Sequence, residues 1–415
     1  MKIAVCNLGC KVNQYECDCL TGELRKRGHE VVEDLQWAEV YILNTCAVTN
    51  EAERKSRQYV SRCLACNPDA KIVVCGCASQ NNAEQFKTKK GVTYVSGVAD
   101  KASLVDKLQA TGVVVSDLPT QYEDDFEAIV ERTRAYVKIQ DGCNNFCSYC
   151  LIPYLRGRSR SRSLSSVVDE CRRLQNSCHE IVLTGIDMSS FGLDTGTSLT
   201  ELIEALAEVE CRIRLGSLEW SAITDELLTA TQKLKSFCPQ FHLSLQSGSD
   251  GVLKKMNRKY TTRQYLDKVE LVRKYYSVAN ITTDVIVGFP TETAEQAKET
   301  EKFVSLVGFG QVHVFPYSSR KGTVAGKMKR VDGESVKQRK ESLGVVVGKC
   351  KEEYLNKFIG KEVEILTEES DGKYAEGYSR EYIRCKVRGA GADRLVLALG
   401  EKIIDGILIC RPKGE

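Results

Sequence analysis

Two patterns of apolar and polar positions alternate along the first quarter of the chain. Short runs of aliphatic and β-branched residues, typical of buried parallel strands, alternate with segments whose apolar residues recur at helical spacing. The predicted strands are Lys2–Cys6, Val40–Asn44, Lys71–Cys75 and Val92–Val95. The predicted helices are Gln14–Arg27, Asn50–Cys66, Ala83–Lys87 and a short one around Ser103–Gln109. This alternation predicts an open, parallel α/β sheet.

Strand-like runs continue through the middle of the chain at intervals of 29 to 44 residues, with helical patterns between them. They begin near Val137, Ile181, Arg212, Phe241, Ile281 and Gln311. Six such units predict a partial (βα)6 barrel, related to the complete barrel of eight units. In such barrels the functional side chains lie at the carboxyl ends of the strands.

Five short strands separated by glycine-containing turns are predicted near the C-terminus. They are Glu362–Leu366, Ala375–Tyr378, Ile383–Val387, Leu395–Leu399 and Ile407–Arg411. A small antiparallel β-barrel would close these strands without an exposed edge, and such barrels commonly bind nucleic acid. Its candidate RNA-binding face contains Arg380, Tyr382, Arg384 and Lys386. The chain therefore divides into predicted domains at residues 1–125, 130–350 and 355–415.

The composition is that of a folded protein whose charges are unevenly distributed. The 415 residues include 59 Lys+Arg and 56 Asp+Glu, a net charge of +3 that excludes a uniformly basic chain. Residues 126–350 carry 32 basic and 26 acidic groups, or +6. No apolar run reaches the ~18–20 residues needed to cross a membrane, and no signal-peptide pattern is visible, so we expect a cytoplasmic protein. Nineteen cysteines in such a reducing compartment indicate metal or redox chemistry.

Three cysteines follow the predicted strands of the first sheet: Cys10, Cys46 and Cys77. Since ligands bind outside the carboxyl ends of parallel strands, we expect these thiols to meet. Three thiolates suit an iron–sulfur cluster with one iron free of protein ligands. Ordinary buried thiols are one alternative. A zinc site made by Cys63 and Cys66 with Cys75 and Cys77 is another, although the last pair is closely spaced and begins inside a strand.

A second set of cysteines, Cys143, Cys147 and Cys150, follows the first strand of the predicted barrel with the spacing C-x3-C-x2-C. No fourth thiol follows in Leu151–Pro153, so this is not the ferredoxin pattern. Three ligands for four irons leave one iron open to a substrate. A zinc knuckle without its fourth ligand is the alternative.

Four arginines alternate with other residues just after this loop: Arg156, Arg158, Arg160 and Arg162. In an extended chain this period of two places all four guanidiniums on one side. Because arginine binds phosphate well, the row is our candidate for contact with an RNA backbone. A solvated basic loop is the alternative.

The C-x3-C-x2-C loop, with Tyr149 before its third cysteine, resembles that of radical S-adenosylmethionine (radical SAM) enzymes. The three segments together resemble the methylthiotransferase family, which has an N-terminal three-cysteine domain, a radical SAM core and a C-terminal TRAM domain. Four segments most resemble the sequences of the branch that acts on threonylcarbamoyladenosine in tRNA: Leu8–Glu16, Asn44–Thr49, Gly142–Cys150 and Arg156–Arg162. The isopentenyladenosine branch usually has Gln-Met-Asn where this chain has Lys11-Val12-Asn13.

This resemblance implies two [4Fe–4S] clusters and SAM as cofactors. The cluster of Cys143, Cys147 and Cys150 would bind SAM and start the radical reaction, and the cluster of Cys10, Cys46 and Cys77 would carry the transferred sulfur. The SAM contacts that it implies are Tyr149, Gly185, Glu219, Gln246 and Asp284, although each also suits a turn at a strand end. It further implies tRNA as substrate, a flavodoxin or ferredoxin-type electron donor, no membrane and a monomeric chain.

The expected reaction is methylthiolation at C2 of N6-threonylcarbamoyladenosine at position 37 of tRNA, next to the anticodon. Two other branches remain alternatives: one acts on isopentenyladenosine in tRNA, and one on an aspartate of a ribosomal protein. A non-catalytic iron–sulfur RNA-binding or redox protein is an alternative of another class. It predicts no 5′-deoxyadenosine when SAM and reductant are added.

Overall fold

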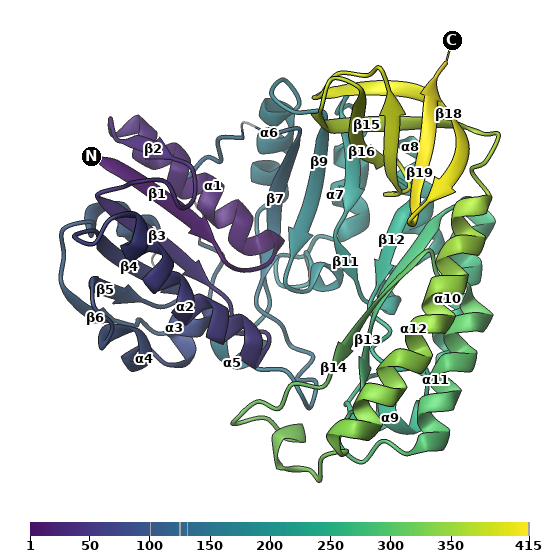
Figure 1. Ribbon diagram of the computed structural model, residues 1–415, viewed down its shortest axis with the longest axis horizontal. Helices are drawn as coiled ribbons and strands as arrows, with labels where there is room; N and C mark the ends of the chain where they lie inside the picture. The colour runs from purple at the N-terminus through teal and green to yellow at the C-terminus, as the bar shows by residue number, and fades with distance from the viewer. Residues whose placement is uncertain (100, 124–125, 131, 414–415) are drawn as a thin grey trace.

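The computed structural model describes residues 1–99, 101–123, 126–130 and 132–413. It contains an N-terminal parallel sheet, a central partial barrel and a small C-terminal barrel, seen in Figure 1 in purple, in teal to green and in yellow. These three parts confirm the predicted α/β fold class. Among the described residues, no helix has the length and apolar character needed to span a bilayer.

The N-terminal sheet has six parallel strands in the order β2-β1-β3-β4-β5-β6. They are β1 (Lys2–Asn7), β2 (Glu30–Val32), β3 (Val40–Thr45), β4 (Lys71–Gly76), β5 (Val92–Ser96) and β6 (Gly112–Val114). Its helices are α1 (Lys11–Lys26), α2 (Asn50–Cys66), α3 (Cys77–Asn81), α4 (Glu84–Lys87) and the 3₁₀ helix η1 (Lys101–Asp106). The four predicted strands are present, whereas β2, β6 and α3 were not predicted. The short helix expected around Ser103–Gln109 is present as the 3₁₀ helix η1, which begins two residues earlier and ends at Asp106.

Alternation along the strands distributes the apolar side chains of this sheet to two layers. In β3, Val40 and Ile42 pack in the cluster that contains Leu24 of α1. Tyr41 and Leu43, one residue out of phase, pack in the cluster that contains helix α2. Because both faces are covered, the strands are continuously apolar, which is why they could be recognised from the sequence.

The central part forms a partial barrel from two four-stranded sheets, ordered β10-β9-β7-β8 and β11-β12-β13-β14. Its strands are β7 (Arg134–Asp141), β8 (Arg160–Ser161), β9 (Glu180–Gly185), β10 (Arg212–Leu215), β11 (Ser217–Leu218), β12 (Gln240–Leu243), β13 (Asn280–Val287) and β14 (Gln311–Pro316). All six predicted strands are present. The third is interrupted at Gly216, so that β10 pairs with β9 and β11 pairs with β12. A side chain at Gly216 would lie 2.8 Å from the carbonyl oxygen of Leu183.

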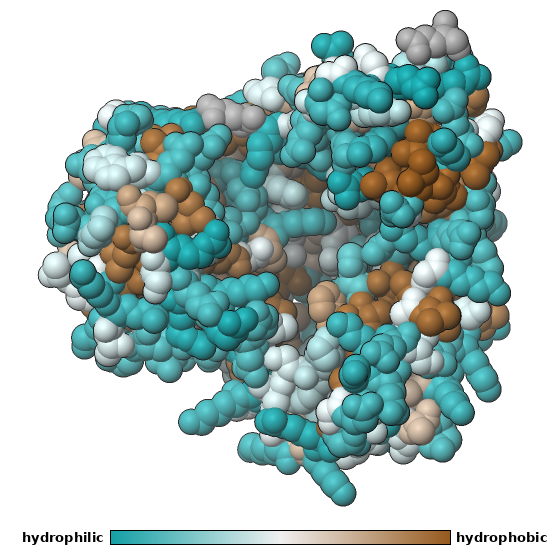
Figure 2. Space-filling model, viewed as in Figure 1, coloured by the Kyte–Doolittle hydropathy of each residue, from teal (hydrophilic) through white to brown (hydrophobic). Residues whose placement is uncertain are grey.

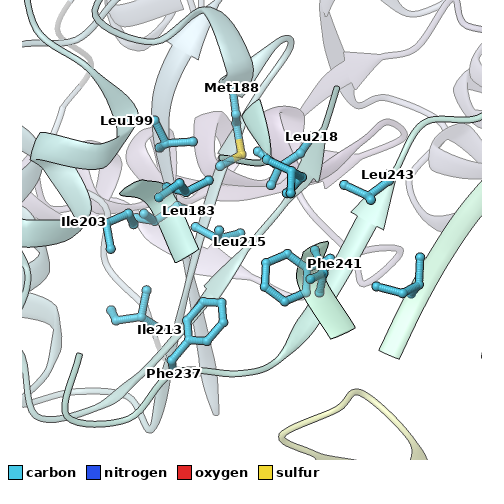
Figure 3. Packing of buried hydrophobic residues seen from close by; sticks show 14 of the residues in the cluster. Leu183, Met188, Leu199, Ile203, Ile213, Leu215, Leu218, Phe237, Phe241 and Leu243 are labelled. Atoms are coloured by element: carbon cyan, nitrogen blue, oxygen red, sulfur yellow. The ribbon is translucent and has the colours of Figure 1, made fainter. Parts of the chain in front are cut away.

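Helices cover the outside of the barrel, and the long α12 runs beside its last strands (Figure 1). The helices of the central part are α5 (Ile152–Arg156), which packs against α3, and α6 (Leu164–Leu174), α7 (Leu199–Ala205), α8 (Asp225–Lys233), α9 (Asp250–Lys255), α10 (Thr262–Tyr275), α11 (Ala294–Val307) and α12 (Gly333–Asn356). The short 3₁₀ helices are η2 (Met188–Ser190), η3 (Trp220–Ala222) and η4 (Ala325–Lys327). Leu183, Leu215 and Phe241 from three strands interdigitate in the core (Figure 3).

The C-terminal strands close into a five-stranded barrel in the order β15-β16-β17-β19-β18. They are β15 (Glu362–Ser370), β16 (Tyr374–Ser379), β17 (Arg384–Arg388), β18 (Arg394–Ile404) and β19 (Ile407–Pro412). The predicted barrel is confirmed, with one refinement: β17 and β19 pair in parallel, while the other pairs are antiparallel. An odd number of strands requires at least one parallel pair when the ring closes.

A buried carboxylate at the start of β9 joins the C-terminal barrel to the central one. Glu180 is fully buried, forms two bonds with Arg214, of 2.7 and 2.9 Å, and is ion-paired with Arg134 at 2.9 Å. Arg214 also donates to the carbonyl of Arg380, and Arg212 bonds Glu364 at 2.7 Å. Burial would raise the pKa of the Glu180 carboxyl, but the guanidiniums of Arg214, Arg134 and Arg212 lower it to about 2. The carboxylate therefore stays charged at every physiological pH.

Replacement of this carboxylate should change how stability depends on pH. The folded pKa lies below the ordinary 4.5, so the stabilisation is present above pH 4.5 and is lost as pH falls through about 2. We expect the difference in free energy of unfolding between wild type and Glu180→Gln to shrink by about 3 kcal/mol between pH 5 and pH 2. Urea unfolding at each pH measures this difference.

Glu204→Gln is the matched control, because Glu204 is 46% exposed and pairs with Lys233 on the surface. Its effect should stay below about 1 kcal/mol throughout. If the difference in free energy of unfolding between wild type and Glu180→Gln stayed constant from pH 5 to pH 2, the lowered pKa of Glu180 would be contradicted.

Candidate active site

The first set of cysteines lies at the carboxyl edge of the N-terminal sheet, as predicted. Cys10 precedes α1, Cys46 follows β3, and Cys77 is the first residue of α3. The pKa of the Cys46 thiol is raised to about 11 by burial, and the neighbouring Cys77 and Cys10 thiols raise it further. The structure therefore brings the three thiols together from three different strand ends.

Gly76 and two asparagines shape this edge. Gly76 has φ +98°, and a side chain there would lie 2.6 Å from Asn44 Oδ1. Asn13 donates from Nδ2 to Asn44 Oδ1 at 2.8 Å, and its own Oδ1 accepts a bond from the Cys10 thiol at 3.2 Å. Glycine permits the close approach of two neighbouring strand ends, and the asparagines orient Cys10.

Cys75 points away from this edge. It packs with Ile42 and Val73 in the layer that contains α1, whereas Cys63 and Cys77 pack in the opposite layer. Residues two apart face the same side of a regular strand, but β4 ends at Gly76, and Cys77 begins α3. The alternative zinc site is therefore wrong, because its four cysteines lie on two faces of the sheet.

The second set lies on the loop after β7, where backbone and side-chain N–H groups are directed at each sulfur. Cys143 Sγ accepts from the amide of Asn145, Cys150 Sγ from the amide of Ile152 and Cys147 Sγ from Arg258 Nη1, each at 3.4 Å. Such donors stabilise the thiolate form, which is the form that binds metal.

The loop itself is held at both ends. Gly142 has φ +72°, and a side chain there would lie 1.9 Å from the carbonyl oxygen of Arg158. Gln140 donates to the carbonyl oxygens of Asp141 and Gly142 at 2.8 and 2.7 Å. Ser148 exchanges backbone bonds with Met256 and Ala325. The three cysteines therefore project from a fixed backbone.

Arg156, the last residue of α5, joins the N-terminal sheet to the first strand of the barrel. Its side chain is 1% exposed and donates to Cys77 Sγ at 3.2 Å, to Glu16 Oε1 at 3.0 Å and to Asp141 Oδ2 at 3.1 Å. Cys77 also lies near the second set: burial is the main cause that raises the pKa of the Cys150 thiol to about 12, and the Cys147 and Cys77 thiols add to it. The two sets are therefore neighbours across the joint between the sheet and the barrel.

The predicted row of four exposed arginines is wrong for three of its members. Arg156 ends a helix, so the segment is not extended throughout. Arg160 is 5% exposed and bonds the Arg156 carbonyl at 2.6 Å, and Arg162 is 8% exposed and pairs with Glu170. Arg158 is exposed, with its guanidinium 4.5 Å from the centre of the Phe146 ring. Carboxylates on distant segments neutralise the buried members, which a local pattern could not indicate.

The predicted face of the C-terminal barrel is also divided. Arg380 donates to the carbonyl of Phe237 in the central barrel at 2.6 Å. Tyr382 stacks on Tyr378 with ring centres 4.5 Å apart. Arg384 pairs with Glu376 at 2.5 Å.

Both sets of thiols fit an iron–sulfur cluster. Within the described ranges, no three Cys, His, Asp or Glu side chains converge on a point that would hold a single metal ion. A cubane spreads its ligands over different irons, so its thiols surround a volume instead. Three thiols in each set, with N–H donors on Cys77, Cys143, Cys147 and Cys150, match that requirement.

A pocket of about 280 Å³ opens beside Cys147. Asp187, Glu219 and Arg258 line it, and Arg258 pairs with Glu219. Burial raises the pKa of the Glu219 carboxyl, and the Arg258 guanidinium opposes that shift. Asp187 lies 3.9 Å from Cys143 Sγ. The sequence interpretation missed Arg258, for which the polar turn directly after α9 was the available signal.

Of the five predicted SAM contacts, Glu219 lines this pocket. Tyr149 packs edge-on against Phe289, with ring centres 6.4 Å apart. Gly185 ends β9 and lies against Gln140 and Met188. Gln246 has φ +66° in the bend after β12. Asp284 lies on β13 with its carboxylate 3.4 Å from His242 Nε2. The SAM roles of these residues stay predictions.

Asp284 instead lines a larger cavity of about 540 Å³, the junction cavity, where the barrel, α1 and the C-terminal barrel meet. Its lining includes Lys11, Arg134, His242, Asp284, His313 and Tyr382. Figure 2 shows a hollow between the N-terminal and C-terminal parts of the molecule. His242 and His313 both face this cavity, with ring centres 6.1 Å apart.

Comparison with known families agrees with this arrangement. Residues 137–304 match the Radical SAM superfamily, and residues 2–97 match the uncharacterized protein family UPF0004. The barrel and its three-cysteine loop thus define a radical SAM enzyme. Threonylcarbamoyladenosine tRNA methylthiotransferase of Bacillus subtilis is 36% identical over 93% of this chain and 90% of its own length. The enzyme of that name from Aquifex aeolicus is 37% identical over 91% and 95%.

More particularly, the chain belongs to the methylthiotransferase family. A further relative, tRNA-2-methylthio-N(6)-dimethylallyladenosine synthase of Thermoanaerobacter sp., is 35% identical over 87% of this chain and 80% of its own length. The family predicted from the cysteine motifs is thereby confirmed.

Solved structures with the same fold are more distant in sequence. TsrM, a radical SAM methyltransferase from Kitasatospora setae, has a TM-score of 0.57 at 15% identity and covers 78% of this chain and 77% of its own. The cobalamin-dependent enzyme OxsB without ligands has a TM-score of 0.53 at 13% identity and covers 86% and 56%. At such identities the likeness concerns the fold alone.

Gly142→Ala should disrupt the second cysteine loop. The new Cβ would clash with the Arg158 carbonyl as well as strain the positive φ, so we expect iron bound by the anaerobically reconstituted protein to fall by about half. Gly196→Ala is the matched control, since Gly196 has φ +74° with nothing within 4 Å. It should cost about 1 kcal/mol of stability and leave the iron content unchanged. Equal iron contents in the two variants would contradict the clash.

Arg156→Met should destabilise the joint between the sheet and the barrel. It removes the guanidinium from two buried carboxylates, and we expect a loss of about 3–5 kcal/mol in free energy of unfolding, measured with urea. Arg158→Met, two residues further along the loop, changes the same side chain at an exposed position. It should cost less than about 1 kcal/mol. Similar losses in both variants would show that Arg156 does not hold the joint.

Proposed function

We propose that this chain methylthiolates C2 of N6-threonylcarbamoyladenosine at position 37 of tRNA, next to the anticodon. The observation that carries the proposal is the pair of three-cysteine sets, which come from different sheets and are neighbours at Cys77 and Cys150. Relatives named for this substrate, at 36–37% identity over more than nine-tenths of the chain, support it. Insertion of sulfur at a carbon needs both a way to remove hydrogen and a sulfur donor, which accounts for two sites.

The proposed cofactors are SAM and two [4Fe–4S] clusters, one on Cys143, Cys147 and Cys150 and the other on Cys10, Cys46 and Cys77. When bound, they supply the one-electron chemistry and the sulfur that a C2–H bond, neither acidic nor electrophilic, requires. The protein's part is positioning, charge and exclusion of water.

The residues of the pocket beside Cys147 have the charges needed to hold SAM. SAM carries an amino group, a carboxylate and a sulfonium. Asp187 and Glu219 provide anionic partners for its cationic groups, while Arg258 fixes Glu219 and donates to the Cys147 sulfur. Burial of Glu219 limits competition from water.

The remaining partners follow from the reaction. A flavodoxin or ferredoxin-type protein would supply electrons, since SAM cleavage requires a cluster at the low end of the range of ~−700 to +450 mV. We propose a monomeric cytoplasmic enzyme whose domains span residues 1–125, 130–350 and 355–415. The exposed Arg158 stays a candidate for contact with the RNA backbone.

The test is an anaerobic assay of the purified holoenzyme with SAM, dithionite and tRNA, followed by mass spectrometry of nucleosides. We expect 5′-deoxyadenosine and the 2-methylthio form of threonylcarbamoyladenosine. Cys143→Ala should abolish both products. Cys46→Ala should retain 5′-deoxyadenosine and lose the methylthio nucleoside, because it affects only the proposed sulfur-carrying site.

Each alternative gives a different result. The 2-methylthio form of isopentenyladenosine, found instead, would assign the chain to the other tRNA branch, to which it is 35% identical in one relative. Methylthiolation of a ribosomal protein, with tRNA unchanged, would assign it to the third branch. No 5′-deoxyadenosine from fully loaded protein would favour a non-catalytic iron–sulfur protein.

A further inference from the structure

Lys11 lies at the edge of the junction cavity. It directly follows Cys10, and its exposed side chain lines the cavity at the start of α1. Among the contacts of the described residues, the side chain of Lys11 has no hydrogen bond or ion pair. It therefore has an unused charge beside one of the thiols proposed to hold the sulfur-carrying cluster.

The three arginines that line the cavity already have carboxylate partners. Arg134 forms an ion pair with Glu180 at 2.9 Å and Arg214 bonds it at 2.7 Å, so both are fixed by the joint to the C-terminal barrel. Arg384 pairs with Glu376. A new anion in the cavity would meet Lys11 without first breaking a protein ion pair.

The other side chains that line the junction cavity suit a flat, polar ligand. His242 on β12 and His313 on β14 place two rings on either side of β13, and Tyr382 lies on the side of the C-terminal barrel. Aromatic faces of this kind stack on nucleic-acid bases. A volume of about 540 Å³ lies within the ordinary range for small-ligand sites.

The proposed substrate carries the matching charge. Threonylcarbamoyladenosine ends in a free carboxylate, whereas isopentenyladenosine ends in an uncharged alkenyl group and unmodified adenosine has neither. A lysine ammonium forms a charge-assisted bond with a carboxylate but gains nothing from an alkene. Charge at this position can therefore distinguish the modified bases.

On the basis of the proposed function, we propose that Lys11 forms an ion pair with the threonyl carboxylate of the substrate and is a specificity-determining residue. Because Cys10 and Lys11 are adjacent in the chain, this ion pair also brings the adenosine to the edge of the sheet where the first three thiols lie. Lys11 acts on substrate binding and orientation, and takes no part in bond breaking.

The test measures equilibrium binding of anticodon stem-loop RNAs to the holoenzyme without reductant. Four RNAs differ at position 37: adenosine, isopentenyladenosine, threonylcarbamoyladenosine, and the methyl ester of the last, which lacks the charge. We expect wild type to bind the acid at least about tenfold more tightly than the ester. Lys11→Gln should bind the two alike, and Lys11→Arg should retain the preference.

Lys351→Gln is the matched control. Lys351 also lines the cavity, from α12, and likewise has no hydrogen bond or ion pair among the described contacts. Its loss should weaken binding of all four RNAs to a similar degree and leave the ratio of acid to ester unchanged. Iron content and visible absorption, measured for each variant, establish that cluster loading is equal.

The outcomes separate the inference from the function on which it rests. Equal affinity of wild type for acid and ester overturns the ion pair, even if Lys11→Gln fails to fold or to load iron. A preference that survives in Lys11→Gln, or is lost equally in Lys351→Gln, also overturns it, while methylthiolation of threonylcarbamoyladenosine by wild type would still uphold the function. If wild type methylthiolates no threonylcarbamoyladenosine, the proposed function itself fails.

Discussion

The structure depends on one buried guanidinium. Arg156 contacts Glu16 from the N-terminal helix, Asp141 from the first barrel strand and Cys77 from the sheet edge. These groups are separated by up to 140 residues in sequence, so no local preference brings them together. A buried arginine is tolerated when carboxylates neutralise it, and removal of either side leaves an uncompensated charge. The same contact that holds the two parts together therefore places a positive charge on a candidate cluster ligand.

The chain fixes the spacing between the two cysteine sets through α5. Five helical residues, Ile152–Arg156, follow almost directly after Cys150 and end at the arginine that contacts Cys77. With a rise of about 1.5 Å per residue, this segment is under about 10 Å long. A short helix is stiffer than a loop of equal length. The separation of the two sites is thus set by local structure, while their alignment is set by the long-range ion pairs.

Features that depend on local interactions could be predicted from the sequence, whereas features that depend on contacts between distant segments could not. Continuous apolar runs identified the strands, and the rule that ligands bind at their carboxyl ends located Cys10, Cys46 and Cys77 correctly at one edge. The spacing of Cys143, Cys147 and Cys150 predicted the loop. The alternation of arginines over Arg156–Arg162 led to a wrong prediction of an RNA-facing row. Three of these arginines are buried against carboxylates from other elements, namely Glu16, Asp141 and Glu170. Motif reasoning found Glu219 in the pocket beside Cys147, but not Arg258, whose role depends on a turn that follows α9.

A partial barrel leaves one side open, and here two other parts of the chain cover it. Helix α1 and the C-terminal barrel close over the strands, and the junction cavity remains between them. Several polar groups at this joint are committed to structure: Glu180 neutralises Arg134 and Arg214, and the His242 ring shares a hydrogen bond with the Thr282 hydroxyl. A cation that serves the fold in this way cannot also bind a substrate without loss of stability. Specificity is therefore expected to reside in groups that the fold does not use, and Lys11, which lies beside Cys10 and whose side chain has no ion pair within the described part of the chain, is such a group.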